Sequence, residues 1–245
     1  ISIGKLALYT AGAGIDPART LPISLDVGTN NRDLLQNDLY LGWPRERLTG
    51  TDYDSLVEEF VEAFQSLFPD ALLQWEDFRK DNALAIMERY RQRLLSFNDD
   101  IQGTGAVALA GLFSALRIKK ENLRDQRIVI LGAGAAGLGI ARQIEAALLL
   151  EGVKSDQMYQ HIAALDSQGL LVDDQNFRDE YKRDLAWPGK FATKHGLVED
   201  RSLEALVAAY KPTVLIGTSG QPGAFHESLV RTMTGNVSQP VILPM

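Results

Sequence analysis

A glycine-rich turn is the first pattern in this sequence that could do chemistry. The stretch Gly132-Ala-Gly134-Ala-Ala-Gly137 follows an apolar run at 127–131 and precedes a helical pattern at 138–150. In such a turn the first glycine permits a tight bend, the second lets the backbone approach a pyrophosphate, and the third lets helix and strand pack closely. The free N–H groups of the helix N-terminus also attract phosphate. The pattern therefore predicts a dinucleotide site, with a turn used only for packing as the alternative.

An aspartate ends the next apolar run along the chain. Asp166 follows residues 161–165, and it lies further beyond Gly137 than the usual ~20 residues. A long helix and the segment 151–160 can absorb the extra length. The Asp166 carboxylate would accept hydrogen bonds from the ribose hydroxyls of NAD and would repel a 2′-phosphate.

Two pairs of acidic residues follow two other predicted strands. Glu76 and Asp77 end a strand at 71–75, and Asp99 and Asp100 end the next strand. Ligands bind at the carboxyl ends of strands in α/β sheets, and carboxylate oxygens suit Mg²⁺ or Mn²⁺. Acidic residues here also commonly cap the following helix, so both interpretations stay open at this point. Four carboxylates at two strand ends would repel one another without a cation, which argues against a purely structural role.

The composition excludes several classes of protein. Hydrophobic residues make up 45% of the 245 residues and charged residues 23%, as in a soluble globular protein rather than a disordered one. Acidic residues outnumber basic ones by 32 to 25 without a basic cluster, which argues against nucleic-acid binding. The lack of cysteine excludes disulfides, thiolate zinc sites and a cysteine nucleophile.

The apolar runs and the two ends of the sequence bear on localisation and length. No apolar run reaches the roughly 18 residues of a membrane span, and the first residues lack a signal-peptide pattern. We therefore expect a cytoplasmic protein with no membrane partner. The chain starts on Ile-Ser-Ile-Gly without methionine and stops on an apolar run at 240–245 that reads as an unfinished strand. We expect the sequence to be a piece of a longer protein.

The elements that must position these residues alternate between helix and strand. Apolar periodicity predicts a buried helix at 103–116 and other helices at 5–11, 52–67 (with Thr51 as N-cap), 82–93, 138–150, 202–210 and 227–233. It predicts strands at 22–26, 71–75, 94–97, 127–131, 161–165, 213–216 and 241–243. The alternation indicates an α/β fold class with a doubly wound parallel sheet. We expect a Rossmann-type domain at 99–245, preceded by part of a second α/β domain at 1–98.

Residues 97–113, FNDDIQGTGAVALAGLF, closely resemble the signature of the malic enzyme family, which includes the malolactic enzymes. The resemblance is supported by GKLALYT at 4–10, LDVGTNN at 25–31, WEDF at 75–78 and PTVLIGTS at 212–219. It covers essentially the whole chain, and the motifs together are highly specific. A member of this family is expected to bind NAD and Mg²⁺ or Mn²⁺, and to form a homo-oligomer as a full-length protein.

The resemblance also implies roles for particular residues. The divalent cation is implied to bind Glu76, Asp77 and Asp100. The catalytic roles fall on Lys5 as general base and on Asp99, which supports it beside the metal. Taken alone, Lys5 is typical of a solvated surface charge. The NAD site is implied to comprise Gly132, Gly134, Gly137 and Asp166, with Thr104 and Ser219 in segments that approach the cofactor.

The implied reaction is the oxidative decarboxylation of L-malate. Lys5, with its pKa lowered by its surroundings, would take the proton from the 2-hydroxyl, and hydride would pass to the nicotinamide. The metal would polarise the ketone and stabilise the enolate formed on loss of CO₂, giving pyruvate and NADH. Ser167 and Gln168 offer no basic side chain after Asp166, which favours NAD over NADP.

Two alternatives stay open. Trp75, in place of the commoner Phe, and Gly105 are similar to malolactic enzymes, which convert L-malate to L-lactate and CO₂ with bound NAD and Mn²⁺. A truncated nucleotide-binding module without turnover is an alternative of another class. The family's general-acid tyrosine, a substrate-binding arginine and a later Ser-Asn-Pro-Thr motif fall outside these residues, so we expect the isolated chain to be inactive.

Overall fold

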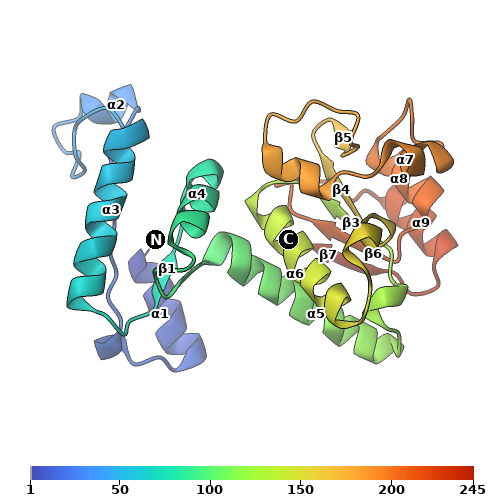
Figure 1. The fold of residues 1–245 in the computed structure, drawn as a ribbon, viewed down its shortest axis with the longest axis horizontal. Coiled ribbons are helices and arrows are strands. Elements are labelled where there is room, and N and C mark those ends of the chain that lie inside the picture. The colour runs from blue at the N-terminus through green and yellow to red at the C-terminus, as the bar shows by residue number, and fades with distance from the viewer. Residues whose placement is uncertain (1) are drawn as a thin grey trace. The chain divides into compact units, whose positions relative to one another are not determined.

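The structure, a computed structural model, describes residues 2–245, which divide into two compact units. The first unit comprises the residues up to Glu76 together with Gln92–Leu95. The second unit comprises Asp77–Arg91 and Ser96–Met245 (Figure 1). Each unit is described by itself.

The first unit is mainly helical. Its elements are α1 (Ser2–Ala13), α2 (Arg32–Leu35), α3 (Gly50–Leu67) and β1 (Leu73–Trp75), with a 3-10 turn at Pro17–Arg19. One face of α3 is buried through Val57, Val61 and Phe64. These residues follow the three- and four-residue spacing of an amphipathic helix. The Trp75 and Phe60 rings form a T-shaped pair with a centroid distance of 6.0 Å.

Two predictions for the first unit are wrong. Residues 22–26 form no strand, because Asp26 takes part in a turn: its carboxylate accepts hydrogen bonds from the amides of Gly28 and Trp43. Such local side-chain bonds compete with pairing in a sheet. The N-cap of α3 is Thr49 rather than Thr51, which lies in the first helical turn.

The second unit contains a five-stranded sheet in the order β5-β4-β3-β6-β7. Strands β3, β4, β6 and β7 are parallel, and β5 pairs antiparallel at one edge. The strands of this unit are β2 (Ser96–Asn98), β3 (Ile128–Leu131), β4 (Ile162–Asp166), β5 (Gly169–Leu170), β6 (Val214–Gly217) and β7 (Val241–Pro244). Its helices are α4 (Lys80–Tyr90), α5 (Thr104–Lys119), α6 (Ala135–Leu150), α7 (Gly189–Lys194), α8 (Leu203–Tyr210) and α9 (Glu227–Asn236). The predicted α/β class with a Rossmann-type sheet is confirmed.

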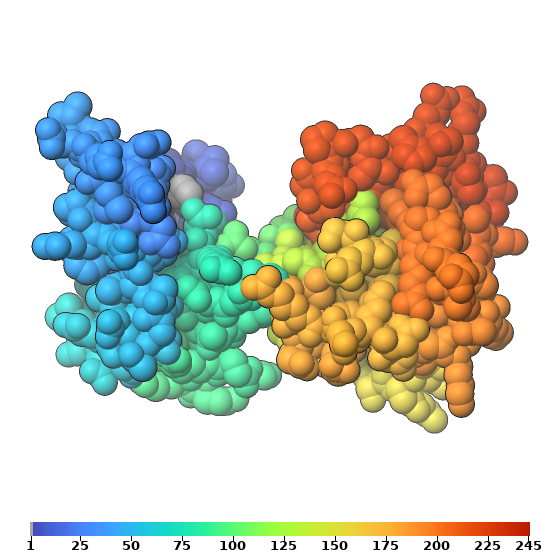
Figure 2. Space-filling view, turned by 90° about the horizontal axis from the view of Figure 1, so that it is seen from above, coloured from blue at the N-terminus to red at the C-terminus, as the bar shows by residue number. Residues whose placement is uncertain are grey.

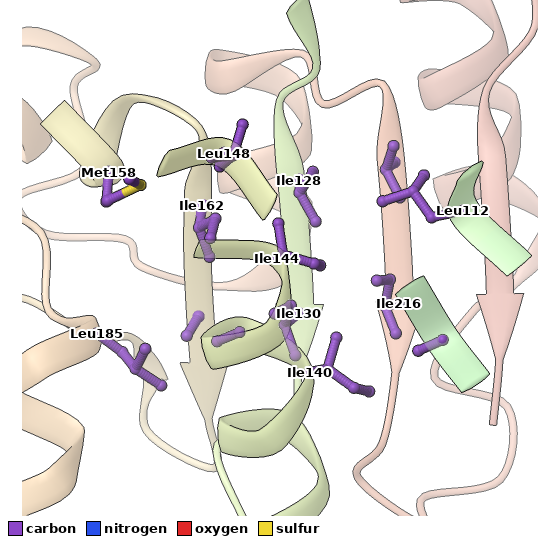
Figure 3. Close-up of a cluster of buried hydrophobic side chains, with 14 of the residues drawn as sticks. Leu112, Ile128, Ile130, Ile140, Ile144, Leu148, Met158, Ile162, Leu185 and Ile216 are labelled. Carbon is purple, nitrogen blue, oxygen red and sulfur yellow. The ribbon is translucent and has the colours of Figure 1, made fainter. Parts of the chain in front are cut away.

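Helices cover both faces of this sheet, as the continuous burial along β3, β4 and β6 requires. Ile128, Ile130 and Ile216 face α5 and α6, where Figure 3 shows them with Ile140 and Ile144. The intervening strand residues pack with buried side chains of α7, α8 and α9, and Figure 1 shows where these three helices lie. Strands buried on both faces are typical of a doubly wound sheet.

The predicted burial of the helix at 103–116 holds for one face only. Ala108, Leu112 and Leu116 of α5 are buried, whereas Val107 and Ile118 are 69% and 82% exposed. The stretch Asp99–Lys119 is long and apolar enough to cross a membrane by length and composition, with 28% of its most apolar window buried. A helix that packs one face on a sheet can have the same composition.

The strand order reverses between β3 and β6. The chain passes from β3 to β4 on one side and later returns to β6 on the other side of β3. At such a switch point the loops that follow the two strands diverge and leave room for a ligand. These loops are the glycine-rich turn after β3 and the Thr218–Ser219 segment after β6.

Candidate functional site

The glycine-rich turn contains two kinds of glycine. Gly132 has φ +115°, and a Cβ there would lie 2.7 Å from the Ser219 amide nitrogen. A Cβ on Gly137 would lie 1.9 Å from the Gly132 carbonyl oxygen. At Gly134, by contrast, no described atom outside the adjoining backbone falls within 4 Å of the ideal Cβ position. The first and third glycines are therefore required for packing, and the second faces open space.

This open position lies at the start of a long helix. Gly134 is the N-cap of the 16-residue helix α6, and among the described residues no side chain caps its first turn. The unpaired N–H groups and the positive end of the helix dipole are both available to an anion. The turn thus has the space and the donors that a dinucleotide pyrophosphate requires.

Asp166 ends β4, as predicted, but it has a basic partner that the sequence did not indicate. The Lys182 Nζ lies 2.6 Å from Asp166 Oδ2, and both side chains are less than one-fifth exposed. The other carboxylate oxygen accepts the Gln168 amide at 2.8 Å. The segment that carries Lys182 lies on the surface of the second unit, in yellow-orange in Figure 2. Because the two residues are 16 positions apart, no local pattern could reveal the pair.

The ion pair continues into a network beside the glycine-rich turn. Asp179 Oδ2 accepts Lys80 Nζ at 2.8 Å and lies 3.6 Å from Lys182 Nζ. The Tyr181 hydroxyl lies 3.3 Å from the Ala133 carbonyl oxygen, within the turn itself. Burial opposes the charge on Lys80, but its hydrogen bonds to Asp179 and Tyr181 prevail and raise the pKa of Lys80. The hydrogen bond from Lys80 lowers the pKa of Asp179.

The second acidic pair lies on a distorted turn of helix. Asp99–Gly103 is a π-helical turn between β2 and α5, and such turns are frequent at functional sites. The buried Asn98 accepts the Ile101 amide at 3.0 Å and so caps the turn. A Cβ on Gly139 would lie 1.9 Å from the Ile101 carbonyl oxygen. Gly139 therefore lets the acidic turn pack directly on the helix that begins at the glycine-rich turn.

Asp77 and Asp100 are joined within the second unit. The Asp77 amide donates to Asp100 Oδ2 at 2.9 Å, and Asp77 has a left-handed backbone with φ +64°. This conformation is uncommon for a residue other than glycine, and strained residues of this kind cluster at functional sites. One direct contact thus joins the segments that follow the two strands.

Glu76 and Lys5 form an ion pair within the first unit. Lys5 Nζ lies 3.0 Å from Glu76 Oε1, with the side chains 29% and 19% exposed. The other Glu76 oxygen accepts the Gln74 side-chain amide at 2.8 Å. Lys5 is therefore not the isolated surface charge that its sequence context indicates when taken alone.

The carboxylates fit a hard divalent cation by their donor chemistry. Glu76 belongs to the first unit, whereas Asp77 and Asp100 belong to the second. Over residues 2–245, no three histidine, aspartate or glutamate side chains gather closely enough to hold one ion. The three implied ligands are thus suited to Mg²⁺ or Mn²⁺, but they do not form one group within either unit.

The remaining two predicted cofactor residues lie at the starts of loops and helices. Thr104 begins α5, with its hydroxyl 3.4 Å from the Asp99 carbonyl oxygen. Ser219 follows β6 and contacts the turn through the packing of its amide on Gly132. Its neighbour Thr218 donates to the Gly132 carbonyl at 2.8 Å. The structure therefore brings Ser219 to the glycine-rich turn and Thr104 to the acidic turn.

Comparisons with known proteins agree along the whole chain. Residues 101–245 match the family profile described as "Malic enzyme, NAD binding domain", and residues 1–91 match "Malic enzyme, N-terminal domain". The chain belongs to the malic enzyme family. As a malic enzyme chain it carries the family's signature residues within the acidic turn and α5, as the sequence resemblance indicated.

Its relatives have two kinds of name. The chain is 47% identical over 246 residues to a malolactic enzyme of Leuconostoc mesenteroides, of which it covers 45%. It is 46% identical over 249 residues to NAD-dependent malic enzyme 3 of Bacillus subtilis (strain 168), of which it covers 44%. Each alignment includes all of this malic enzyme chain, which spans less than half the length of these relatives.

A solved structure shares the fold. The malic enzyme of Entamoeba histolytica matches with a TM-score of 0.65 and 25% identity over 98% of this chain and 42% of that protein. The malic enzyme fold thus extends through both units, each taken by itself.

Proposed function

We propose that the complete protein carries out the oxidative decarboxylation of L-malate to pyruvate and CO₂, with NAD as oxidant and Mg²⁺ or Mn²⁺ as cofactor. The observation that carries the proposal is the glycine-rich turn of this malic enzyme chain. Gly134 leaves open space at an uncapped helix N-terminus, and Gly139 packs the acidic turn on the same helix.

The second unit would bind the dinucleotide. The amides at the start of α6 would hold the pyrophosphate against Gly134. Asp166 would accept the ribose hydroxyls, and Lys182 would hold the Asp166 carboxylate in place at 2.6 Å. Lys182 also offers a positive charge near the position of a 2′-phosphate, so NAD preference rests on the carboxylate outweighing this charge. The NAD-dependent relatives support this preference.

The chemistry would fall on Lys5 and the acidic residues. Lys5 would remove the proton of the 2-hydroxyl, and Asp99 would support it. Glu76, Asp77 and Asp100 would hold the divalent cation through carboxylate oxygens. When bound, NAD accepts the hydride and the cation polarises the ketone oxygen that develops.

A second candidate is the malolactic reaction, which gives L-lactate and CO₂ from L-malate. The malolactic relatives, at 47% identity, favour it on sequence. Of the two features that favoured it on sequence, Gly105 has a packing role here. A Cβ on Gly105 would lie 2.7 Å from the Gly139 carbonyl oxygen, between α5 and α6. Trp75 is buried against Phe60 and likewise fits a role in the core.

Product analysis tests the proposal directly. The complete protein would be incubated with ¹³C-labelled L-malate, NAD and Mn²⁺, with NADH followed by absorbance and products by NMR. Pyruvate formed in step with NADH is the expected result. Lactate without net NADH would establish the malolactic reaction, and no turnover of malate would overturn both.

Turnover by the isolated residues, localisation and oligomeric state are the subjects of three further proposals. Because the chain spans less than half the length of its relatives, we propose that these residues alone bind nucleotide without turning over malate. We also propose a cytoplasmic homo-oligomer for the complete protein. Sedimentation of the complete protein checks the oligomeric state, and the same NMR assay on the 245 residues checks the lack of turnover.

A further inference from the structure

A chain of hydrogen bonds leads from Glu76 into the first unit. The Gln74 side-chain amide donates to Glu76 Oε2 at 2.8 Å. The Gln74 side-chain oxygen accepts the Tyr9 hydroxyl, also at 2.8 Å. Together with the Lys5–Glu76 ion pair, these contacts connect two residues of α1 with Gln74 of β1 and with Glu76, which directly follows β1. Nothing in the proposed reaction uses Tyr9 or Gln74.

The two pairs of residues can contact each other because the helical and extended repeats give them similar spacings. Lys5 and Tyr9 are four residues apart on α1, which places them on one face with a rise of about 6 Å. Gln74 and Glu76 are two residues apart on an extended segment, which also places them on one face, about 6.6 Å apart. Because the two spacings nearly agree, Lys5 contacts Glu76 while Tyr9 contacts Gln74. Figure 1 shows α1 and β1 in the first unit.

The chemistry of the groups fixes their orientation. A carboxylate only accepts hydrogen bonds, so the NH₂ group of Gln74 must face Glu76 and its oxygen must face Tyr9. The tyrosine hydroxyl then donates to that oxygen. Each Glu76 oxygen has its own donor, Lys5 on one and Gln74 on the other, and the carboxylate plane cannot turn without breaking one of these contacts.

We propose that Gln74 is a positioning residue that orients Glu76 for the divalent cation, and that Tyr9 anchors Gln74. The inference rests on the proposed function, because Glu76 has no cation to hold without it. Substituting a residue that hydrogen-bonds to a metal ligand commonly lowers metal affinity about 10- to 100-fold. The Tyr9–Gln74 and Gln74–Glu76 hydrogen bonds lie within the first unit, whereas the α6 turn belongs to the second unit.

The test measures Mn²⁺ binding to the complete protein by electron paramagnetic resonance of the free ion, without turnover. Gln74→Leu should weaken Mn²⁺ binding at least about tenfold, and Tyr9→Phe should weaken it less. The double variant should match Gln74→Leu alone, because Tyr9 acts through Gln74. The affinity for NAD should not change in any of them.

The matched control is Gln65→Leu, which makes the same substitution in the same unit and removes a 2.8 Å contact to the Arg93 carbonyl. It should leave Mn²⁺ binding at the wild-type level. If Gln74→Leu also binds Mn²⁺ like the wild type while Glu76→Gln loses it, the inference is overturned and the proposed cation site stands. If the wild type binds no Mn²⁺, both are overturned. Should Gln74→Leu fail to fold, Tyr9→Phe decides: unchanged Mn²⁺ affinity overturns the inference.

Discussion

The glycine-rich turn and the acidic strand ends differ in how the chain assembles them. The turn lies within six consecutive residues, and the nearest packing neighbours of Gly132 and Gly137 fall inside the second unit. The acidic residues come from segments more than twenty positions apart, and Glu76 belongs to a different unit from Asp77 and Asp100. A site made by one local turn can be read from spacing, whereas a site made by separate segments depends on the packing that brings them together.

The largest expected effect comes from removing one carboxylate in each unit. We expect Glu76→Gln and Asp100→Asn each to lower kcat/KM for malate about a thousandfold, since both residues would hold the same cation in the proposed site. Steady-state kinetics on the complete protein measures this. Asp70→Asn in the first unit and Asp156→Asn in the second are matched controls, because both residues are exposed outside the site. Full activity in either site variant would show that the two units do not share one cation.

Two glycine substitutions test whether the acidic turn packs on α6. In Gly139→Ala the new Cβ would meet the Ile101 carbonyl, so we expect a loss of about 2 kcal/mol in the free energy of unfolding. Gly111→Ala on the exposed part of α5 has nothing among the described residues within 4 Å of the new Cβ. It should stabilise the protein by roughly 0.5–1 kcal/mol. Urea unfolding measures both, and equal effects would contradict the packing of the acidic turn on α6.

Glu145 tests a carboxylate of α6 that lies outside the proposed cation and nucleotide sites. Burial, assisted by the charge of Asp184, raises the pKa of Glu145 to about 7 from its ordinary 4.5. The folded protein favours the protonated form of Glu145 more than the unfolded chain does. The resulting contribution to the free energy of unfolding is fully present below about pH 4.5 and is lost as the pH rises through about 7. We expect the free energy of unfolding to fall by about 2 kcal/mol between pH 5 and pH 8.

The substitution Glu145→Gln should remove most of this pH dependence. Urea unfolding across the pH range measures it, and Glu62→Gln, on the exposed face of α3, is the control. An unchanged slope in Glu145→Gln would mean that another group is responsible.

Lys182 tests the edge of the proposed nucleotide site, with the smallest expected effect of a site variant. Lys182→Ala leaves Asp166 without its 2.6 Å partner, so a 2′-phosphate would meet a less compensated carboxylate. We expect the Kd for NADP to rise about tenfold more than the Kd for NAD, as for the loss of one charge-assisted contact. Calorimetric titration with each nucleotide measures the ratio, and the exposed Lys190→Ala is the control. A ratio that does not change would remove Lys182 from the nucleotide site.

Much of the second unit could be predicted from the sequence. The strands at 127–131, 161–165, 213–216 and 241–243 each lie within one residue of the observed strand. Apolar runs bounded by turn residues are strong local signals. The glycine-rich turn was also predicted, because the conformation that Gly132 requires and the close packing at Gly137 are properties of a few neighbouring residues.

The rest depended on contacts that have no local signal. The Asp26 turn replaced an expected strand through a bond to Trp43, which is 17 residues away. The Lys182–Asp166 pair and the packing of Gly139 on Ile101 likewise join separate segments. Gly139 is the one local signal among these contacts that the sequence contains. It lies inside a predicted helix, where glycine is costly unless close packing requires it.

The most direct test of the account is a calorimetric titration of the complete protein with NAD, comparing the wild type with Gly134→Ala. The extra methyl would occupy the open space at the start of α6 without meeting any described atom. We predict that Gly134→Ala unfolds at the same urea concentration as the wild type but binds NAD at least about tenfold more weakly, a change of about 1.4 kcal/mol. Equal affinity for NAD in both proteins would contradict the claim that this turn is the nucleotide site.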